Sequence, residues 1–518
     1  MGLLRLTARV DGRLRRHGHV PAGLRPLPER RRVVPRGRGR TARTPARQHR
    51  SPHSGAPVTL TTTTDAWRPA AHFTAASTWL NDPNGLLFHN GTYHLFFQNN
   101  PSGSTWGNMS WGHATSTDLV SWTEQPVAIP VLDGEMAFSG SAVADVRNTA
   151  GFAGPGETAL VAVYTAARAP LADGSGASQA QALAFSLDDG ATWTRYAGNP
   201  VLDIGSAEFR DPKVFWFGGD DGHWVMVAVE AVERRVVVYT SHDLRTWTRR
   251  SDFGPAHAVG GVWECPDLFP LRIRGSEDTK WLLIVSLNPG GVAGGSGSQY
   301  FVGDFDGTTF TADRISDSAD LADYDWLDYG RDYYAAVSFN DAPDERRLTI
   351  AWASNWDYAN ETPTGPWRSA MSLVRELDLV TGSDGRLALA QRPVLPAAAA
   401  ARACTVFDVS VSCLPGDRTE LRLLTDETDD EVVITVDAGE GVLTCDRTRS
   451  GAVDFAPSFP SVDWAPLPAP DESGRVAICI VIDASVVEIF LGGGLSTLTQ
   501  LVFPTAPFTT LRVREAAE

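Results

Sequence analysis

The sequence predicts an all-β protein, a five-bladed β-propeller followed by a C-terminal β-sandwich. From Trp67 to about Arg392, short runs of β-branched and aromatic residues alternate with turns rich in Asp, Asn and Gly. No long amphipathic helix interrupts these runs, and such a pattern is typical of strands. One turn pattern recurs along this region, and a second set of alternating strands follows it. These three observations carry the prediction.

Individual strands are predicted in order along the chain. The clearest runs in the first part lie at residues 92–97, 159–164, 224–229 and 235–239. The clearest runs in the last quarter lie at 431–436, 476–482 and 486–491. Each has the length and the β-branched content of a strand in a packed sheet.

The recurring turn pattern places Ser and Asp before a turn and an aromatic residue after it. It occurs at 116–122, 186–193 and 241–247, with weaker copies at 304–310 and 383–387. Five hairpins at separations of roughly 55 to 80 residues match the radial repetition of four-stranded blades. Because such hairpins occur in any antiparallel protein, a different β fold is the alternative.

The domain boundaries follow from changes in composition. The propeller is expected over 66–392, a Pro- and Ala-rich linker over 393–403, and the sandwich over 404–518. Residues 1–57 are rich in Arg, Pro and Gly and show no periodicity. We interpret them as a disordered extension of non-native sequence, with translation beginning near Val58; a nucleic-acid arm or a targeting peptide is the alternative.

The charge distribution argues against nucleic acid as a partner. The net charge is −17, but residues 1–50 hold 15 Arg against two acids, which leaves 30 basic and 60 acidic residues for the rest. The chain has only two lysines, Lys213 and Lys280. Phosphate binding needs clustered Lys and Arg, so a neutral ligand is expected. No apolar run is long enough to span a membrane, and no feature indicates an oligomeric state.

The five cysteines include no closely spaced pair of the kind that holds zinc. An odd number of cysteines, without an apolar signal segment, favours a reducing compartment. We therefore expect a cytoplasmic protein, with a secreted protein as the alternative.

Three acidic residues lie in unusual local sequences: Asp82 and Asp211, each directly followed by proline, and Glu264, which precedes Cys265 and Pro266. Proline restricts the residue before it to extended angles, so Asp82 and Asp211 are expected in rigid extended segments that suit a catalytic carboxylate. Taken singly, each segment is also a common turn sequence.

Several motifs together resemble one enzyme family. They are Trp-Leu-Asn-Asp-Pro-Asn-Gly at 79–85, Tyr-His-Leu-Phe-Phe-Gln at 93–98, Trp-Gly-Asn-Met-Ser-Trp-Gly-His at 106–113, Phe-Ser-Gly-Ser at 138–141, Arg-Asp-Pro at 210–212, Trp-Glu-Cys-Pro-Asp at 263–267, Asp-Tyr-Gly-Arg-Asp-Tyr-Tyr-Ala at 328–335 and Asn-Trp-Asp-Tyr-Ala at 355–359. In content, order and spacing, the chain resembles glycoside hydrolase family 32, the β-fructofuranosidases.

The resemblance implies a five-bladed propeller with a funnel-shaped pocket, a C-terminal sandwich, and roles for the three acids. Asp82 matches the nucleophile, Glu264 the acid/base, and Asp211 a stabiliser of the sugar. Cleavage with retention needs one ionised and one protonated carboxyl group, roughly 5 to 5.5 Å apart. The chemistry needs no metal and no cofactor.

The resemblance also places six residues in the sugar pocket: Asn81, Gln98, Trp106, Ser139, Arg210 and Trp356. Amides and hydroxyls bind sugar hydroxyls, and Trp rings offer flat apolar faces. Most of the other Trp residues, including Trp122, Trp193 and Trp247, are expected to pack the sheets. We interpret His113 and Cys265 as structural residues as well.

The function implied is hydrolysis of terminal β-linked fructose from fructans (levan or inulin) and sucrose. Residues 106–113 and 352–376 resemble exo-inulinases and levanases more than sucrose-phosphate hydrolases. An invertase or a fructosyltransferase would use the same three acids. A non-catalytic carbohydrate-binding propeller is the alternative from another class, and the presence of all three acids argues against it.

Overall fold

The computed structural model describes residues 63–170, 176–382, 384–395 and 404–515, and in these the regular structure is almost entirely strand. The exceptions are the short helix α1 (Thr63–Ala66) and the 3-10 turns η1 (Leu321–Asp323) and η2 (Pro343–Glu345). The predicted all-β class is therefore confirmed. No helix in the described ranges is long and apolar enough to cross a membrane. The basic opening at 1–57 and most of the predicted linker lie outside these ranges.

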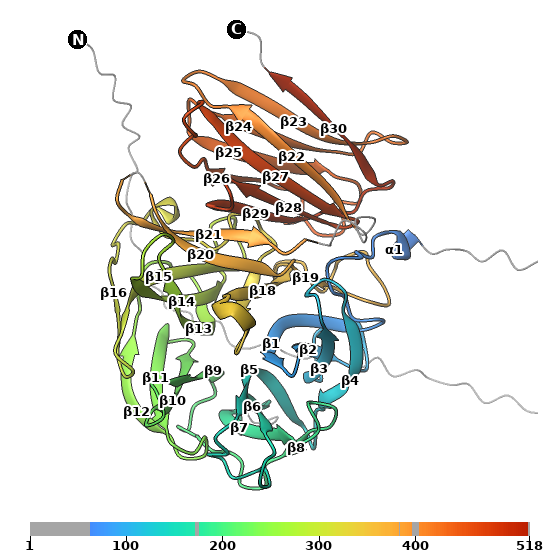
Figure 1. The fold of residues 1–518 in the computed structure, drawn as a ribbon. Helices are drawn as coiled ribbons and strands as arrows, with labels where there is room; N and C mark the ends of the chain where they lie inside the picture. Colours follow the sequence, from blue (N-terminus) through green and yellow to red (C-terminus); the bar gives the residue numbers. More distant parts are fainter. Residues whose placement is uncertain (1–62, 171–175, 383, 396–403, 516–518) are drawn as a thin grey trace, which may run out of the picture. The chain divides into compact units, whose positions relative to one another are not determined.

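Five antiparallel sheets follow one another along the chain, each with its strands in sequence order (Figure 1). The first contains β1 (Trp79–His89), β2 (Thr92–Asn100), β3 (Ser110–Ser116) and β4 (Thr123–Ile129). The second contains β5 (Glu135–Asp145), β6 (Ala159–Arg168), β7 (Ser178–Ser186) and β8 (Thr194–Arg195). The third contains β9 (Phe209–Phe217), β10 (His223–Glu230), β11 (Arg235–Ser241) and β12 (Thr248–Phe253).

The fourth sheet contains β13 (Val262–Arg272), β14 (Thr279–Asn288), β15 (Gly297–Phe305) and β16 (Phe310–Ala312). The fifth contains β17 (Tyr334–Ser338), β18 (Leu348–Ala353), β20 (Arg375–Thr381) and β21 (Leu387–Pro393), with β19 (Ala370–Met371) paired to β18. The four strand runs predicted in this region lie within β2, β6, β10 and β11, so these predictions are confirmed.

The recurring turn pattern connects the third and fourth strands of its sheets. In the first sheet, Ser116 Oγ donates to Asp118 Oδ1 over 3.0 Å, and that oxygen accepts the amides of Val120 and Ser121 at 2.9 and 2.6 Å. Ser241 and Asp243 repeat this arrangement in the third sheet. A short Asp side chain that bonds amides further along the chain stabilises a tight turn, which explains why the pattern is visible in the sequence.

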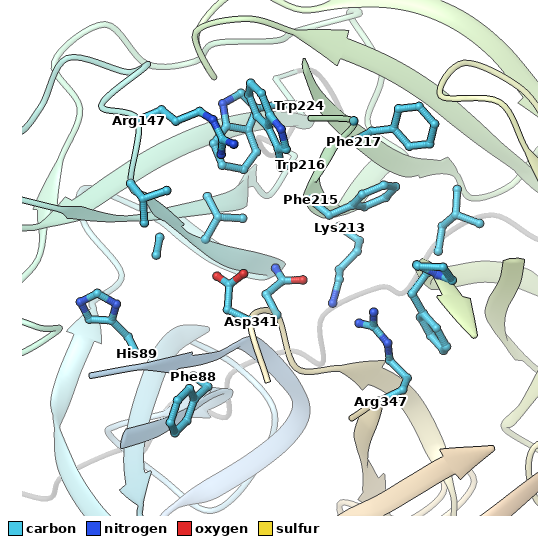
Figure 2. A pocket seen from close by; sticks show the side chains of 18 of the residues that line it. Phe88, His89, Arg147, Lys213, Phe215, Trp216, Phe217, Trp224, Asp341 and Arg347 are labelled. Atoms are coloured by element: carbon cyan, nitrogen blue, oxygen red, sulfur yellow. The ribbon is translucent and has the colours of Figure 1, made fainter. Parts of the chain in front are cut away.

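The first strands of the five sheets contact one another in a closed cycle. β1 contacts β5, β5 contacts β9, β9 contacts β13, β13 contacts β17, and β17 contacts β1. One axis is thereby surrounded by five strands. A cavity of about 660 Å³ lies at the end where these strands finish (Figure 2).

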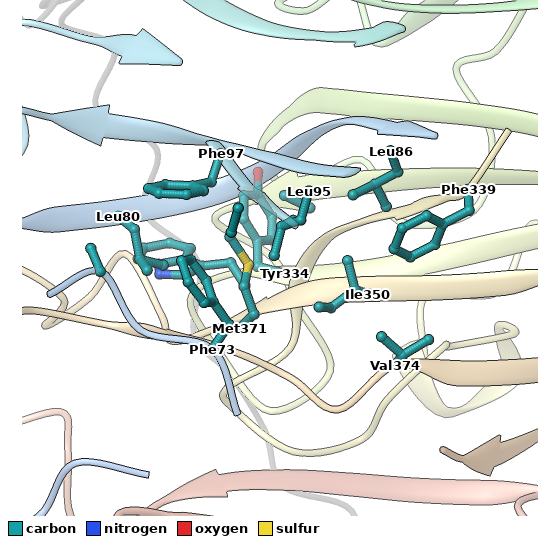
Figure 3. Packing of buried hydrophobic residues seen from close by; sticks show 14 of the residues in the cluster. Phe73, Leu80, Leu86, Leu95, Phe97, Tyr334, Phe339, Ile350, Met371 and Val374 are labelled. Atoms are coloured by element: carbon teal, nitrogen blue, oxygen red, sulfur yellow. The ribbon is translucent and has the colours of Figure 1, made fainter. Parts of the chain in front are cut away.

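A hydrophobic cluster joins the first sheet to the fifth and so completes the cycle. Leu80, Leu86 and Phe97 of the first sheet pack with Tyr334 and Ile350 of the fifth, as Figure 3 shows. All five side chains are at most 2% exposed. Burying large apolar side chains stabilises the fold by about 1.5–3 kcal/mol each, so this contact holds the first and last sheets together.

Two further sheets follow in the last quarter of the chain. One contains β22 (Thr405–Ser412), β27 (Arg475–Asp483), β28 (Val486–Leu491) and β29 (Ser496–Leu501). The other contains β26 (Val462–Pro466), β25 (Val442–Arg449), β24 (Glu431–Asp437), β23 (Arg418–Thr425) and β30 (Phe508–Glu515). Leu421 and Ile434 of the second share one buried core with Ile480 and Ile489 of the first. The predicted strands at 431–436, 476–482 and 486–491 are confirmed.

Candidate active site

The pairing of each of the five first strands is irregular near the end where the strand begins. The shifts fall between Leu80 and Pro83 in β1, Phe138 and Gly140 in β5, Arg210 and Lys213 in β9, Glu264 and Asp267 in β13, and Tyr334 and Val337 in β17. Bulges bend a strand and redirect its side chains, and they are common next to active sites. Prolines at 83, 212 and 266 lie within three of them, where the ladder needs no amide donor.

Asp82 lies in the bulge of β1 and its carboxylate is held from both sides. Ser139 Oγ donates to Asp82 Oδ2 over 2.7 Å, and Asn81 Nδ2 donates to Oδ1 over 2.9 Å. Asn84 Nδ2 donates to the backbone carbonyl of Asp82. The side chain is therefore fixed in one orientation relative to the axis.

Asp211 lies in the bulge of β9, next to Asp82. Its Oδ2 accepts the backbone amide of Cys265 over 2.9 Å, and its own amide donates to Thr165 Oγ1. The Cys265 thiol lies 3.6 Å from Asp82 Oδ2 and 3.7 Å from Asp211 Oδ2, so it contacts both carboxyl groups. Residues from three separate strands therefore meet at one point.

The extended conformation predicted for Asp211 is wrong. Its φ is +62°, and Cys265 has a φ of +47°, both in the left-handed region that non-glycine residues seldom adopt. The preference that proline imposes on the preceding residue is a local one. Here the bulge and the hydrogen bond from the Cys265 amide impose a different backbone conformation. Strained residues of this kind cluster at functional sites.

Glu264 lies in the bulge of β13 and has a different set of partners. Arg210 donates to its Oε1 from Nε and Nη2, over 3.2 and 3.1 Å, and Tyr334 donates its phenol hydroxyl to Oε2. Arg210 also pairs with Glu208 over 2.7 Å. The Glu264 side chain is 23% exposed and that of Asp211 only 6%, so Glu264 has more access to solvent than Asp211.

Burial and mutual repulsion dominate the electrostatics of the site. Burial, followed by the charge of Glu264, raises the pKa of Asp82 above its usual range, although hydrogen bonds from Ser139 and Asn81 oppose the shift. Burial raises the pKa of Asp211 to about 7, against the nearby Arg210. Burial and the three carboxyl groups also raise the pKa of the Cys265 thiol, which stays protonated. When several acidic groups share one pocket, repulsion between their charges disfavours ionising all of the groups at once.

The other sequence-predicted residues fall at different distances from the acids. Asn81 and Ser139 bond the carboxylate of Asp82, and Arg210 bonds that of Glu264 and lies 3.9 Å from that of Asp211. Gln98 is buried and bonds Asn84 Oδ1 at 3.4 Å and the carbonyl of Ala137 at 3.0 Å.

The two predicted aromatic residues of the sugar pocket pack against other aromatic rings. Trp356 stacks on Trp79 with ring centroids 6.1 Å apart. Trp106 is 43% exposed, with its ring edge against Phe138.

Sequence reasoning missed two residues that bond the acidic groups. Tyr334, within the motif at 328–335, donates to Glu264, and Asn84 connects Asp82 to the amide of Gly140. Only their places in the quoted motifs hinted at a role. Of the residues expected to be structural, His113 stacks on Phe96, and burial lowers its pKa to about 3, which keeps the ring neutral. Cys265 instead contacts the carboxyl groups of Asp82 and Asp211.

Successive antiparallel sheets with three converging carboxyl groups at one end of their first strands define an all-β glycoside hydrolase. The family models that match are the glycosyl hydrolases family 32 N-terminal domain, over residues 72–393, and the family 32 C-terminal domain, over residues 385–518. The chain belongs to this family.

Relatives support the same assignment. The chain is 43% identical over 487 residues to the extracellular exo-inulinase of Aspergillus ficuum, covering 85% of this chain and 90% of that one. It is 41% identical over 467 residues to the levanase of Bacillus subtilis, covering 85% and 66%. Among solved structures, the exo-inulinase of Aspergillus awamori superposes with a TM-score of 0.79 at 40% identity, over 86% of this chain and 95% of that one.

The expectation of a cytoplasmic protein is wrong. The exo-inulinases of Aspergillus ficuum, Aspergillus niger and Aspergillus awamori are all named as extracellular. All five cysteines are unpaired in the structure, and an odd number of unpaired thiols does not by itself fix the compartment.

Proposed function

We propose that this family 32 hydrolase is a retaining β-fructosidase that releases terminal β-D-fructofuranosyl residues from levan or inulin and from sucrose. The observation that carries the proposal is the convergence of Asp82, Asp211 and Glu264 from three first strands, with the Cys265 thiol between the first two. Relatives named exo-inulinase, levanase and invertase support the substrate class.

Asp82 acts as the nucleophile in this proposal. Its carboxylate attacks C2 of the fructosyl unit while Glu264 gives its proton to the departing glycosidic oxygen, so that a fructosyl ester forms on Asp82. Ser139 and Asn81 hold the attacking carboxylate in place. Water then attacks C2, Glu264 takes back a proton, and the bond to Asp82 breaks. Two displacements at the same carbon retain its configuration.

The acid/base residue must alternate between proton donor and proton acceptor, so it needs access to both the leaving group and water. Glu264 meets this requirement. Its partial exposure provides that access, and Arg210 and Tyr334 fix the orientation of its carboxyl group. Asp211 is proposed to accept hydrogen bonds from fructose hydroxyls. Its backbone bond from Cys265 holds it rigid for this task.

We also propose the sugar contacts and the finer architecture. Asn81, Gln98, Trp106, Ser139, Arg210 and Trp356 bind the sugar, and no metal or cofactor takes part. The five sheets of 66–392 form a five-bladed propeller, 393–403 a linker, and 404–518 a β-sandwich. The cyclic contacts of the first strands and the shared core of the last two sheets support this arrangement.

The test measures initial rates on sucrose, inulin and levan, and follows the first product by proton NMR. Hydrolysis of all three with release of β-fructofuranose before mutarotation is the expected result. Release of the α-anomer would contradict retention. Longer oligosaccharides accumulating at high sucrose in place of free fructose would instead identify a fructosyltransferase, and absence of turnover a binding protein.

A further inference from the structure

The cavity at the far end of the five first strands is a second site that the hydrolase function does not use. All five sheets contribute to it, as Figure 2 shows, because it lies on the axis they share. Its volume of about 660 Å³ lies within the range of small-molecule pockets, roughly 300–1,000 Å³. The side chains used below are Arg147, Lys213, Phe215, Trp216, Asp341 and Arg347.

This cavity is separate from the carboxylate site. Asp211 is the third residue of β9, and strands rise about 3.3 Å per residue, so the innermost cavity residue Lys213 lies about 7 Å along the strand from Asp211 and the outermost, Phe217, about 20 Å. Between the carboxylate site and the cavity lies a constriction of about 10 Å³, lined by Asp211 and Cys265 on one side and Lys213 on the other. Such a volume holds about one water molecule, so no sugar passes through it.

The cavity is lined by more positive than negative charge. Arg147, Lys213 and Arg347 line it, and Asp341 is the only carboxylate among the lining residues in the described ranges. Figure 2 shows the Lys213 and Arg347 side chains directed into the same part of the cavity. Elsewhere the folded chain is strongly acidic, so this concentration of cations is a local feature.

The two inner cations differ in their partners. Lys213 bonds the carbonyl and the hydroxyl of Ser338 at 2.6 and 3.2 Å and lies 3.4 Å from Asp267, so its three donors are used. Arg347 makes one long contact, from Nη1 to the carbonyl of Phe339 at 3.4 Å, and its buried Nε has no partner in the described residues. Burial lowers the pKa of both groups. A desolvated guanidinium with an unused donor favours an anion.

The remaining wall of the cavity is aromatic. Phe215, Trp216, Phe217, Trp224, Phe269 and Trp281 line it. Arg347 lies over Phe269 and Arg147 over Trp216, with 4.7 and 4.5 Å from guanidinium carbon to ring centroid. An aromatic wall beside a cationic base suits a molecule with a flat apolar body and one negative group.

We propose that this cavity binds a small organic anion with a flat apolar body, the anionic group at Arg347 and Lys213 and the body against the aromatic wall. The bound molecule occupies the axis of the fold without reaching the catalytic acids. Sucrose hydrolysis therefore continues in its presence.

The test uses a matched pair of fluorescent probes, 8-anilinonaphthalene-1-sulfonate and its uncharged counterpart N-phenyl-1-naphthylamine. The full chain is expected to bind one equivalent of the sulfonate in a saturable manner, and 0.5 M fructose should not displace it. Arg347→Gln should weaken sulfonate binding at least tenfold and change binding of the uncharged probe less than twofold. The sucrose hydrolysis rate of this variant should equal that of the native chain.

Arg245→Gln is the matched control, because Arg245 also lies over aromatic rings, Phe152 and Tyr196, and has a buried Nε without a partner, but it is not part of the cavity. It should leave sulfonate binding unchanged. Arg147→Gln, at the rim, serves as a second variant if Arg347→Gln does not fold. Equal losses in the cavity and control variants, displacement by fructose, or no binding of the sulfonate would each overturn the proposal.

Discussion

Tyr334 donates its phenol hydroxyl to Oε2 of Glu264, a residue 70 positions earlier in the chain. Because Arg210 occupies Oε1 of the same carboxyl group, both oxygens are held and the plane of the group is fixed. Tyr334 begins β17 and Glu264 lies near the start of β13, so neighbouring first strands of the cycle set the position of the proposed acid/base.

The first prediction concerns Tyr334→Phe, which removes only the hydroxyl and keeps the buried ring. Hydrogen bonds to charged groups contribute roughly 1.5–3 kcal/mol, so kcat on sucrose should fall about 10- to 100-fold while KM stays within twofold. Tyr333→Phe is the control, since the Tyr333 hydroxyl is buried without a partner. Steady-state kinetics decide: equal losses in both variants would show that Tyr334 acts only through packing.

The second prediction separates Asp82 from Glu264. Asp82→Ala removes the nucleophile, so sucrose and p-nitrophenyl β-fructofuranoside should both remain uncleaved. Glu264→Ala removes the proton donor, so sucrose hydrolysis should fall about 10²- to 10⁴-fold while first-step cleavage of the activated fructoside largely persists. Burst kinetics on both substrates measure this. An active Asp82→Ala, or normal sucrose turnover by Glu264→Ala, would falsify the assignment.

How much of the fold and of the site can be predicted from the sequence depends on how far apart in the chain the interacting residues lie. The hairpin turns with Ser116 and Ser241 are predictable because every bond lies within a few residues of the Ser. The strand runs are predictable because strands that bury alternate or successive residues have apolar residues at those positions in the sequence. The three acids are predictable by resemblance, since their motifs are contiguous.

What escapes prediction involves residues far apart in the chain. The left-handed conformation of Asp211 depends on the amide of Cys265, 54 positions away, and overrides the local effect of Pro212. Tyr334 reaches Glu264 only because β17 and β13 are neighbours in the cycle. The cation-lined cavity draws its residues from all five sheets, so no short motif marks it.

The third prediction concerns pH and the segment before β1. His72 is buried, which alone would lower its pKa, but hydrogen bonds to Asp483 and Glu488 raise the pKa of His72 to about 9. Its Nδ1 lies 2.8 Å from Asp483 and its Nε2 3.1 Å from Glu488. Arg375 and His72 in turn lower the pKa of Glu488 to about 2, against the effect of its burial.

The direction in which stability changes with pH follows from the linkage between proton binding and folding. The His72 contribution is fully present below its unfolded pKa of about 6.5 and is lost as pH rises through 9. The Glu488 contribution is present above about 4.5 and is lost as pH falls through 2. These two groups together therefore stabilise the fold most between about pH 4.5 and 6.5, and between pH 6.5 and 9.5 urea unfolding of the native chain should lose about 3 kcal/mol more than that of His72→Gln. His72→Gln should flatten the alkaline loss, and His242→Gln, at an exposed site, should not.

The last prediction concerns Arg375, which is fully buried in β20 and connects the fifth sheet to the C-terminal sheets. It donates to Glu488 Oε2 at 2.7 Å, to Asp328 Oδ2 at 3.0 Å and to Thr499 Oγ1 at 2.7 Å. Arg375→Met fills much of the same space but leaves the buried carboxylate of Asp328 without a cation and that of Glu488 with His72 alone. Breaking a buried ion pair in this way costs about 3–5 kcal/mol.

The midpoint of urea unfolding measures that loss, with Arg386→Met as the control because Arg386 is exposed and pairs only with Asp384 at 3.8 Å. The control should change stability by less than about 0.5 kcal/mol. Adding Asp328→Asn to Arg375→Met should recover part of the loss, since it removes the carboxylate left without a cation, and the two substitutions should therefore not be additive. A loss in Arg375→Met no greater than in the control would show that this network does not hold the C-terminal sheets to the fifth sheet.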